Sequence, residues 1–125
     1  MTRRSNPLQG LLDEVAGNPR AQEIIERTRI ASSLGELAYR MRSAAELTQG
    51  EVATAVGTRQ SVISRLEGGN GGHVPSMPQM ERIAAACGFS MTVGANPIAA
   101  QKMDQQALEV QIPAPPSFGL DESES

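Results

Sequence analysis

The stretch from Leu47 to Glu67, LTQGEVATAVGTRQSVISRLE, most constrains what this chain can fold into. Thr48, followed three residues later by Glu51, has the pattern of a capping box. In that motif the hydroxyl accepts a free N–H of the first helical turn and the carboxylate reaches back to the cap. Two valines then recur four residues apart, and Gly57 permits the backbone of a sharp turn. The pattern predicts a short helix that ends in a tight turn.

A second short helix fits directly after this turn. Ile63 and Leu66 share one face of it, and Gly68 ends the helical pattern. The opposite face carries polar and cationic side chains, namely Gln60, Ser61, Ser64 and Arg65. Two short helices joined by a tight glycine turn, the second with a polar and cationic face, predict a helix-turn-helix.

These residues resemble the lambda-repressor-like DNA-binding domain, also called the Cro/cI or XRE family. The first helix and the turn match at Leu47, Thr48, Gln49 and Gly57. The recognition helix matches at Gln60, Ser61, Ile63, Ser64, Arg65, Leu66 and Glu67, and the match continues through PSMPQMERIAAACG. The resemblance covers roughly residues 35 to 90. It implies an all-α, lambda-repressor-like bundle whose recognition helix reads the major groove of double-stranded DNA.

Eight residues are candidate DNA contacts: Gln49, Thr58, Arg59, Gln60, Ser61, Val62, Ser64 and Arg65. Residues 61, 64 and 65 share one helical face, and Gln60 points outward at its start. Gln pairs with adenine, Arg with guanine, Ser serves several bases, and the Val62 methyls suit a thymine methyl. For Gln49 the resemblance implies a phosphate contact that steadies the recognition helix. The alternative is a solvated polar helix face.

Arg59 departs from the family pattern, which usually has Ser or Thr as the cap of the recognition helix. Loss of that cap costs about 1 kcal/mol of stability. Thr58 is an alternative cap that shifts the start of the helix by one residue. Arg59 compensates in this interpretation by reaching a phosphate or a base edge.

The charge of the chain argues for local rather than overall attraction to DNA. The formal net charge of the 125 residues is −3, which is unusual for a nucleic-acid-binding protein. Residues 35–90 are balanced at five Arg against five acidic residues, and residues 91–125 carry one Lys against five acids. Phosphate contacts depend on placed arginines and backbone N–H groups, so a local patch suffices. The balance predicts modest non-specific affinity and a need for a homodimer.

Other functional classes find little support in the composition. Cys87 is the only cysteine, so an intrachain disulfide is excluded and a reducing cytoplasm fits. Neither a signal peptide nor a membrane span is expected. His73 is the only histidine, and neither a metal-ligand cluster nor a catalytic constellation is recognisable. We therefore expect no enzyme, no metal and no cofactor, and a core of aliphatic side chains, because Tyr39, Phe89 and Phe118 are the only aromatic residues.

The N-terminal part divides into an arm and a helical extension. Residues 1–17 are expected to be a flexible arm, although the spacing of Leu8, Leu11, Leu12 and Val15 leaves open a short helix that forms against a partner. Asn18 and Pro19 predict a helix start, and apolar residues recur at helical spacing from there to Leu47. Gly35 interrupts this pattern, so one long bent helix and two successive helices remain alternatives.

The segment after the recognition helix begins with GGNGGHVP, residues 68–75, which predicts a flexible loop. In the resembling family this loop passes close to the DNA backbone, so its N–H groups or His73 are candidate phosphate contacts. Ser76 and Gln79 form a second capping-box pattern, and the apolar stripe of the following helix includes Cys87. Residues 89–95 alternate as a strand. We expect the same strand of a second subunit to pair with it across a dyad.

The domain division is therefore a flexible arm at 1–17, a helix-turn-helix domain with its extension and strand at 18–95, and an acidic tail at 96–125. The tail is expected to be disordered, with a short helix as an option over 99–110. Together these features predict a dimeric repressor that reads a palindromic operator with half-sites about one helical turn apart.

The extra N-terminal helix, the strand and the small size resemble HigA-type antitoxins. That resemblance implies a type II toxin-antitoxin protein that represses its own operon and neutralises a RelE/HigB-like toxin through residues 1–34 or 96–125. A stand-alone phage or bacterial XRE-type regulator is one alternative. A protein-interaction adaptor that has lost DNA binding is another, supported by the neutral domain.

Overall fold

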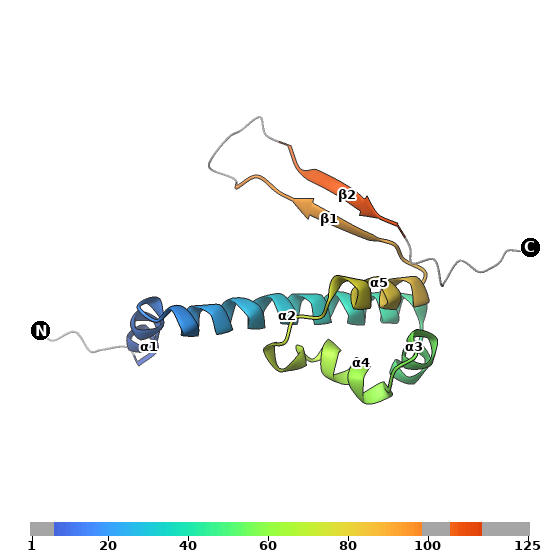
Figure 1. Ribbon diagram of the computed structural model, residues 1–125, viewed down its shortest axis with the longest axis horizontal. Helices are drawn as coiled ribbons and strands as arrows, with labels where there is room; N and C mark the ends of the chain where they lie inside the picture. The colour runs from blue at the N-terminus through green and yellow to red at the C-terminus, as the bar shows by residue number, and fades with distance from the viewer. Residues whose placement is uncertain (1–6, 99–105, 114–125) are drawn as a thin grey trace, which may run out of the picture.

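The computed structural model describes residues 7–98 and 106–113 and is mostly helical (Figure 1). The α-helices of this part are α1 (Pro7–Ala16), α2 (Pro19–Ala45), α3 (Gln49–Val56), α4 (Gln60–Glu67) and α5 (Met77–Ala86). A 3-10 turn, η1 (Asn70–Gly72), follows α4, and the strands β1 (Met91–Ala95) and β2 (Leu108–Ile112) form an antiparallel sheet. The prediction of a helical bundle with a helix-turn-helix and a short C-terminal strand is confirmed.

α2 is one continuous helix of 27 residues, which decides between the two alternatives left open by Gly35. Its start is the predicted one, because Asn18 Oδ1 accepts hydrogen bonds from the N–H groups of Arg20 and Ala21 at 3.0 and 3.2 Å. At about 1.5 Å per residue the helix is about 40 Å long. α1 packs against its N-terminal end, α4 and α5 pack against its C-terminal half, and α3 packs on α4 and α5 (Figure 1).

Gly35 lies where α2 crosses α4. A Cβ at this position would lie 2.4 Å from the carbonyl oxygen of Leu66 and 3.0 Å from that of Glu67. The glycine therefore serves a close approach of two helix backbones, and the helix continues through it at a cost of about 1 kcal/mol in propensity. The same residue that interrupts the apolar pattern brings the two helices together.

The core lies between the C-terminal half of α2 and the three following helices. Its largest fully buried side chains are aliphatic, namely Ile63, Leu66, Met80, Ile83 and Val52. Cys87 is also buried, as its place on the apolar stripe predicts, and Met91 joins β1 to this cluster. Across residues 7–98 and 106–113, no helix is long and apolar enough to cross a membrane.

The N-terminal residues differ from the expected flexible arm where the structure describes them. Pro7–Ala16 form α1, which is the helical alternative, and Arg3 and Arg4 lie outside the described residues. α1 packs against the N-terminal part of α2, and Gln22 Nε2 donates a hydrogen bond of 2.6 Å to the Ala16 carbonyl oxygen. The partner that orders this helix is therefore α2 of the same chain.

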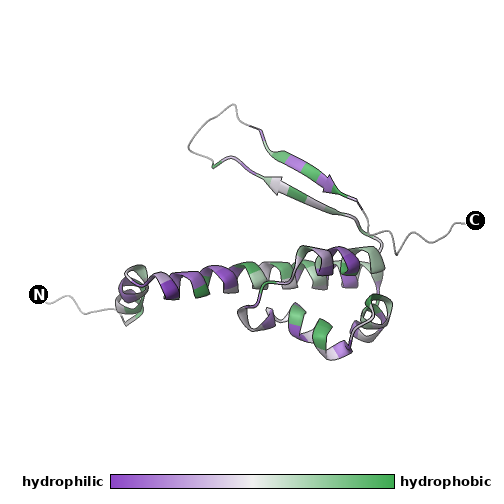
Figure 2. Ribbon diagram, viewed as in Figure 1, coloured by the Kyte–Doolittle hydropathy of each residue, from purple (hydrophilic) through white to green (hydrophobic). Residues whose placement is uncertain are grey.

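β1 is the predicted strand, but its partner corrects the expectation of a dyad-related copy. β2 of the same chain pairs with it antiparallel, with Met91 opposite Ile112 and Ala95 opposite Leu108. The optional helix over 99–110 is likewise corrected for residues 108–110, while 99–105 and 114–125 lie outside the described residues. The physical reason is the alternation of hydrophobic and hydrophilic residues along β2, LEVQI, which has the period of a strand (Figure 2).

Candidate DNA-binding site

The helix that precedes the turn is capped as its sequence predicts. Thr48 Oγ1 accepts a hydrogen bond of 3.0 Å from the N–H of Glu51, and the N–H of Thr48 donates one of 2.8 Å to Glu51 Oε1. α3 is capped at its C-terminus by Gly57, whose φ of 88° is the left-handed conformation that redirects the chain. This turn packs α4 against α3 and leaves the outer surface of α4 exposed to solvent.

The start of α4 has no side-chain cap. Arg59 occupies the cap position with an extended backbone and makes no capping hydrogen bond, and the helix begins at Gln60. Thr58 therefore does not take over as cap, which corrects that alternative.

α4 buries one face and exposes the other. Ile63 and Leu66 are 1% and 0% exposed. The candidate contact residues on the opposite side are exposed, namely Arg59, Gln60, Ser61, Ser64 and Arg65, while Val62 and Thr58 are half-buried. Their position on one solvent-facing surface is the predicted one, and their contact with DNA stays a prediction.

Gln49 and Gln60 are brought together although eleven residues separate them. Gln60 Nε2 donates a hydrogen bond of 2.6 Å to Gln49 Oε1, and Gln49 Nε2 donates one of 3.0 Å to Glu67 Oε1. The first residue of α3 thus links both ends of α4. The side chain of Gln60 is oriented by this chain of hydrogen bonds before any ligand binds.

The far end of this network is an ion pair between α2 and α4. Arg42 Nε and Nη2 donate to the two carboxylate oxygens of Glu67 at 2.6 and 3.0 Å, and Nη1 donates to the Leu47 carbonyl oxygen at 2.9 Å. The two side chains are only 16% and 7% exposed. The hydrogen bond to Glu67 raises the pKa of the Arg42 guanidinium above its ordinary value, so this cation stays charged throughout the accessible pH range.

The sequence analysis missed Arg42 and the structural role of Glu67. Arg42 also lies over the ring of Tyr39, at 5.4 Å from its centroid. The pair spans 25 residues, so neither helical periodicity nor a local motif indicates it. The available signal was the position of the Glu67 carboxylate directly after Leu66, at the end of the buried face of the helix.

Residues 33–93 match the family model described as a helix-turn-helix domain. This segment is a helix-turn-helix domain. The match spans just under half of the chain and contains α3, α4, α5 and the C-terminal part of α2. Neither the comparison with curated proteins nor the comparison with solved structures gave a match. Both the sequence match and the fold therefore identify a helix-turn-helix domain, and α1, the first half of α2 and β2 lie outside the matched residues.

The glycine-rich loop of the helix-turn-helix domain is attached to α2 rather than free. η1 contacts α2, and Gly69 is buried, with Ser32 as the nearest neighbour of a Cβ built there. Asn70 Nδ2 donates a hydrogen bond of 2.9 Å to the His73 carbonyl oxygen, and His73 itself is exposed. The suggested phosphate contact of this loop stays a prediction.

Cys87 belongs to the core of the helix-turn-helix domain, and no cluster of metal-ligating side chains is present in the described ranges. Burial raises the pKa of its thiol above the ordinary value of 9.0, while the charge of Arg42 opposes this rise more weakly. The unfolded chain thus loses the thiol proton at a lower pH than the folded protein does.

The raised pKa predicts a stability that is complete below about pH 9 and falls as the pH rises further, with a slope of at most about 1.4 kcal/mol per pH unit. We expect Cys87→Ala to lack this component. Urea unfolding of both proteins between about pH 8 and pH 10.5 measures it, because all other groups are shared. Parallel curves for the two proteins would contradict the assignment.

Proposed function

We propose that the chain is a sequence-specific transcriptional repressor that binds a palindromic operator as a homodimer. The observation that carries the proposal is the hydrogen bond between Gln60 and Gln49 on the exposed side of the helix-turn-helix. It uses one of the two Nε2 hydrogens of Gln60. The second hydrogen and Oε1 remain for the N7 and N6–H of an adenine, which is the bidentate pairing that identifies this base.

The geometry of the network supports base reading rather than general solvation. A free glutamine side chain loses rotamer freedom when it binds a base, and this loss weakens the contact. In this chain Gln49, Glu67 and Arg42 already hold Gln60. The adaptor alternative gives no reason for such an ordered polar chain at the start of α4.

The remaining candidates divide by position along α4. Arg65 has the length and charge for a guanine, and Ser61 and Ser64 lie on the same exposed face. Thr58 and Arg59 flank the first turn of α4, where backbone N–H groups favour phosphate oxygens. Val62 is half-buried, so only part of its side chain is available to a thymine methyl.

We expect Gln60→Ala and Arg65→Ala each to weaken specific DNA binding about 10- to 100-fold, corresponding to one lost bidentate base contact. The measurement is fluorescence anisotropy with a labelled duplex from upstream of the gene, at two salt concentrations. Wild-type binding should weaken steeply with salt. Arg82→Ala is the matched control, because Arg82 is an exposed arginine on α5. Equal affinities of all four proteins would show that the proposed base contacts are wrong.

We further propose that this repressor is the antitoxin of a type II toxin-antitoxin module. In this proposal residues 18–95 contain the DNA reader, and either residues 1–34 or residues 96–125 supply the surface for a RelE/HigB-like toxin. α1 and β2 support it as ordered elements beyond the matched domain. Co-purification with the small basic product of an adjacent gene distinguishes an antitoxin from a stand-alone XRE-type regulator.

A further inference from the structure

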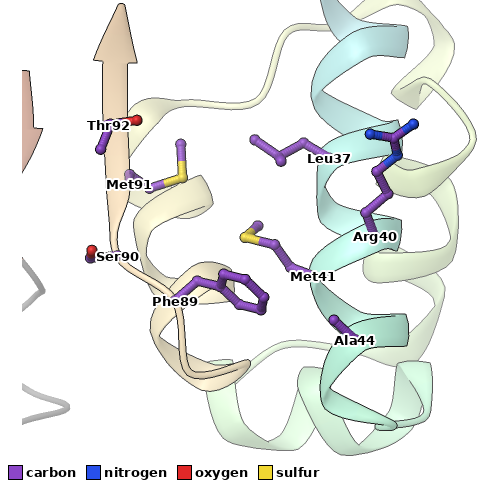
Figure 3. Close-up of a pocket in the computed structure, with 8 residues that line it drawn as sticks. All are labelled: Leu37, Arg40, Met41, Ala44, Phe89, Ser90, Met91 and Thr92. Carbon is purple, nitrogen blue, oxygen red and sulfur yellow. The ribbon is translucent and has the colours of Figure 1, made fainter. Parts of the chain in front are cut away.

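An apolar groove lies between α2 and the segment that leads into β1, on the other side of α2 from the recognition helix (Figure 3). Its cavity volume is about 350 Å³. The lining comes from one face of α2 and from four consecutive residues: Leu37, Arg40, Met41 and Ala44, then Phe89, Ser90, Met91 and Thr92. Figure 3 shows the apolar side chains of the two sides pointing toward one another across the groove.

The β-hairpin extends the apolar wall of this groove. Cross-strand partners lie on the same face of a sheet, and the register places six apolar residues on one face: Met91, Val93, Ala95, Leu108, Val110 and Ile112. Met91 is buried at the base, whereas Val93, Val110 and Leu108 are 44%, 62% and 71% exposed. An isolated two-stranded hairpin is marginally stable in water. A partner that packs on this apolar face would therefore stabilise the hairpin.

The same chain carries a helix of the size and chemistry that such a groove accepts. Leu11 and Leu12 of α1 are 56% and 50% exposed although α1 packs on α2. Ile24 and Ile25, at the adjoining end of α2, are 47% and 49% exposed. An amphipathic helix in an apolar groove is a common mode of recognition between proteins.

The charges of the two surfaces are complementary. The charged residues of α1 are Asp13 and Glu14, both acidic. The charged residue among those that line the groove is Arg40. Arg40 also pairs with Glu36 at 3.1 Å, but both side chains are more than 60% exposed, and such a pair contributes little. Arg40 is therefore available to an acidic helix.

α1 cannot reach the groove of its own chain. It is joined by Gly17 and Asn18 to the start of α2, and the groove begins at Leu37 of the same continuous helix. At about 1.5 Å per residue the two sites are roughly 30 Å apart along a rigid rod. A second copy with its α2 antiparallel brings its own α1 to the groove, and the reciprocal contact forms at the same time.

We propose that each groove between α2 and the β-hairpin binds α1 of a second copy of this chain. This inference rests on the proposed dimeric function and names the surface that makes the dimer. α4 lies on the opposite side of α2 from the hairpin (Figure 1). A two-fold axis that runs from the hairpin side to the α4 side leaves both recognition helices facing the same way, as a palindromic operator requires.

The test combines two variants whose sites meet only across the interface. Leu12→Glu places a charge on α1, and Leu37→Lys places the opposite charge in the groove. Each alone damages both contacts of the dimer, so we expect the dimer dissociation constant to rise roughly 100-fold, because each replaces an apolar side chain in the contact with a charged one that loses its hydration there. Sedimentation equilibrium without DNA measures this, and far-UV circular dichroism checks that both variants fold. Phe89→Lys replaces Leu37→Lys if the latter does not fold.

An equimolar mixture of the two variants restores dimers in this arrangement. The mixed dimer has one wild-type contact and one contact in which the carboxylate introduced by Leu12→Glu meets the ammonium group introduced by Leu37→Lys. The matched control mixes Leu12→Glu with Leu37→Glu, which places like charges together and is expected to stay monomeric. Restoration by the first mixture and not by the second supports the proposed surface.

Three results would overturn it: a wild-type monomer at tens of micromolar, single variants that dimerise like wild type, or a charge-paired mixture that stays monomeric. These results would not contradict the proposed DNA binding, because binding of the monomeric variants to a duplex with one half-site is measured separately. Retained half-site binding with unchanged dimers would reject this interface alone. A wild-type protein that dimerises through this surface but does not bind the duplex would contradict the proposed function and leave the interface supported.

Discussion

Glu67→Ala is expected to lower the free energy of unfolding by about 3 kcal/mol, since removal of one partner leaves the other charge largely buried and unpaired. The guanidinium of Arg42 is held by both oxygens of this carboxylate, at 2.6 and 3.0 Å, and its side chain is only 16% exposed. Gln49 loses its acceptor in the same step. Urea unfolding followed by circular dichroism measures the change.

A more exposed Arg–Glu pair on α2 offers a matched control. Arg40 and Glu36 are 3.1 Å apart, but their side chains are 73% and 62% exposed. Glu36→Ala is therefore expected to cost less than about 1 kcal/mol. Similar losses for the two variants would show that burial does not set the strength of the Arg42–Glu67 pair.

The substitution at Glu67 is also expected to weaken DNA binding although Glu67 lies at the far end of α4 from Gln60. Its carboxylate orients Gln49, and Gln49 orients Gln60. The loss of affinity should persist at a temperature where the variant is fully folded. Wild-type affinity in the folded variant would show that Gln60 needs no such support.

Gly35→Ala is expected to destabilise the protein by about 3 kcal/mol, at the upper end of the usual cost of overpacking. The new Cβ would lie 2.4 Å from the Leu66 carbonyl oxygen, and backbone atoms of α4 cannot move aside as a flexible side chain does. α2 and α4 must therefore separate, which opens the core around Leu66. The gain in helix propensity of about 1 kcal/mol offsets only part of this cost.

Gly50→Ala is the control for propensity alone. In α3 the nearest neighbour of a Cβ at this position is Thr48 Oγ1 at 3.9 Å, an ordinary contact. This variant is expected to be as stable as the wild type or more stable by up to about 1 kcal/mol. Thermal unfolding of both variants compares them directly. A stable Gly35→Ala protein would mean that the two helices do not cross this closely.

The helix-turn-helix itself could be predicted from the sequence because its signals are local. The capping box of Thr48 and Glu51, the turn at Gly57 and the apolar spacing of Ile63 and Leu66 each lie within a few residues, and all appear in the structure. The cap of α2 at Asn18 is of the same kind. Backbone hydrogen bonding and helical periodicity act over one or two turns, so a short stretch of sequence specifies them.

The exposed face of α4 was predictable for the same reason, but its internal order was not. Periodicity places Gln60 and Arg65 away from the core. It does not indicate that Gln49 holds Gln60, because that bond depends on how closely α3 and α4 pack. The missing cap at Arg59 was visible in the sequence, yet the choice between Thr58 and Arg59 required the actual start of the helix.

The sequence by itself determined the helices, their caps and the tight turn of the helix-turn-helix, because these depend on neighbouring residues. Only the tertiary structure decided that α2 runs through Gly35 to meet α4, that Arg42 pairs with Glu67 and that β2 completes the sheet with β1. Each of these depends on contacts between residues far apart in the chain, as with Met91 and Ile112. Forming such a contact costs the entropy of closing the intervening loop. The sequence pattern around one residue does not indicate which distant residue will be its partner.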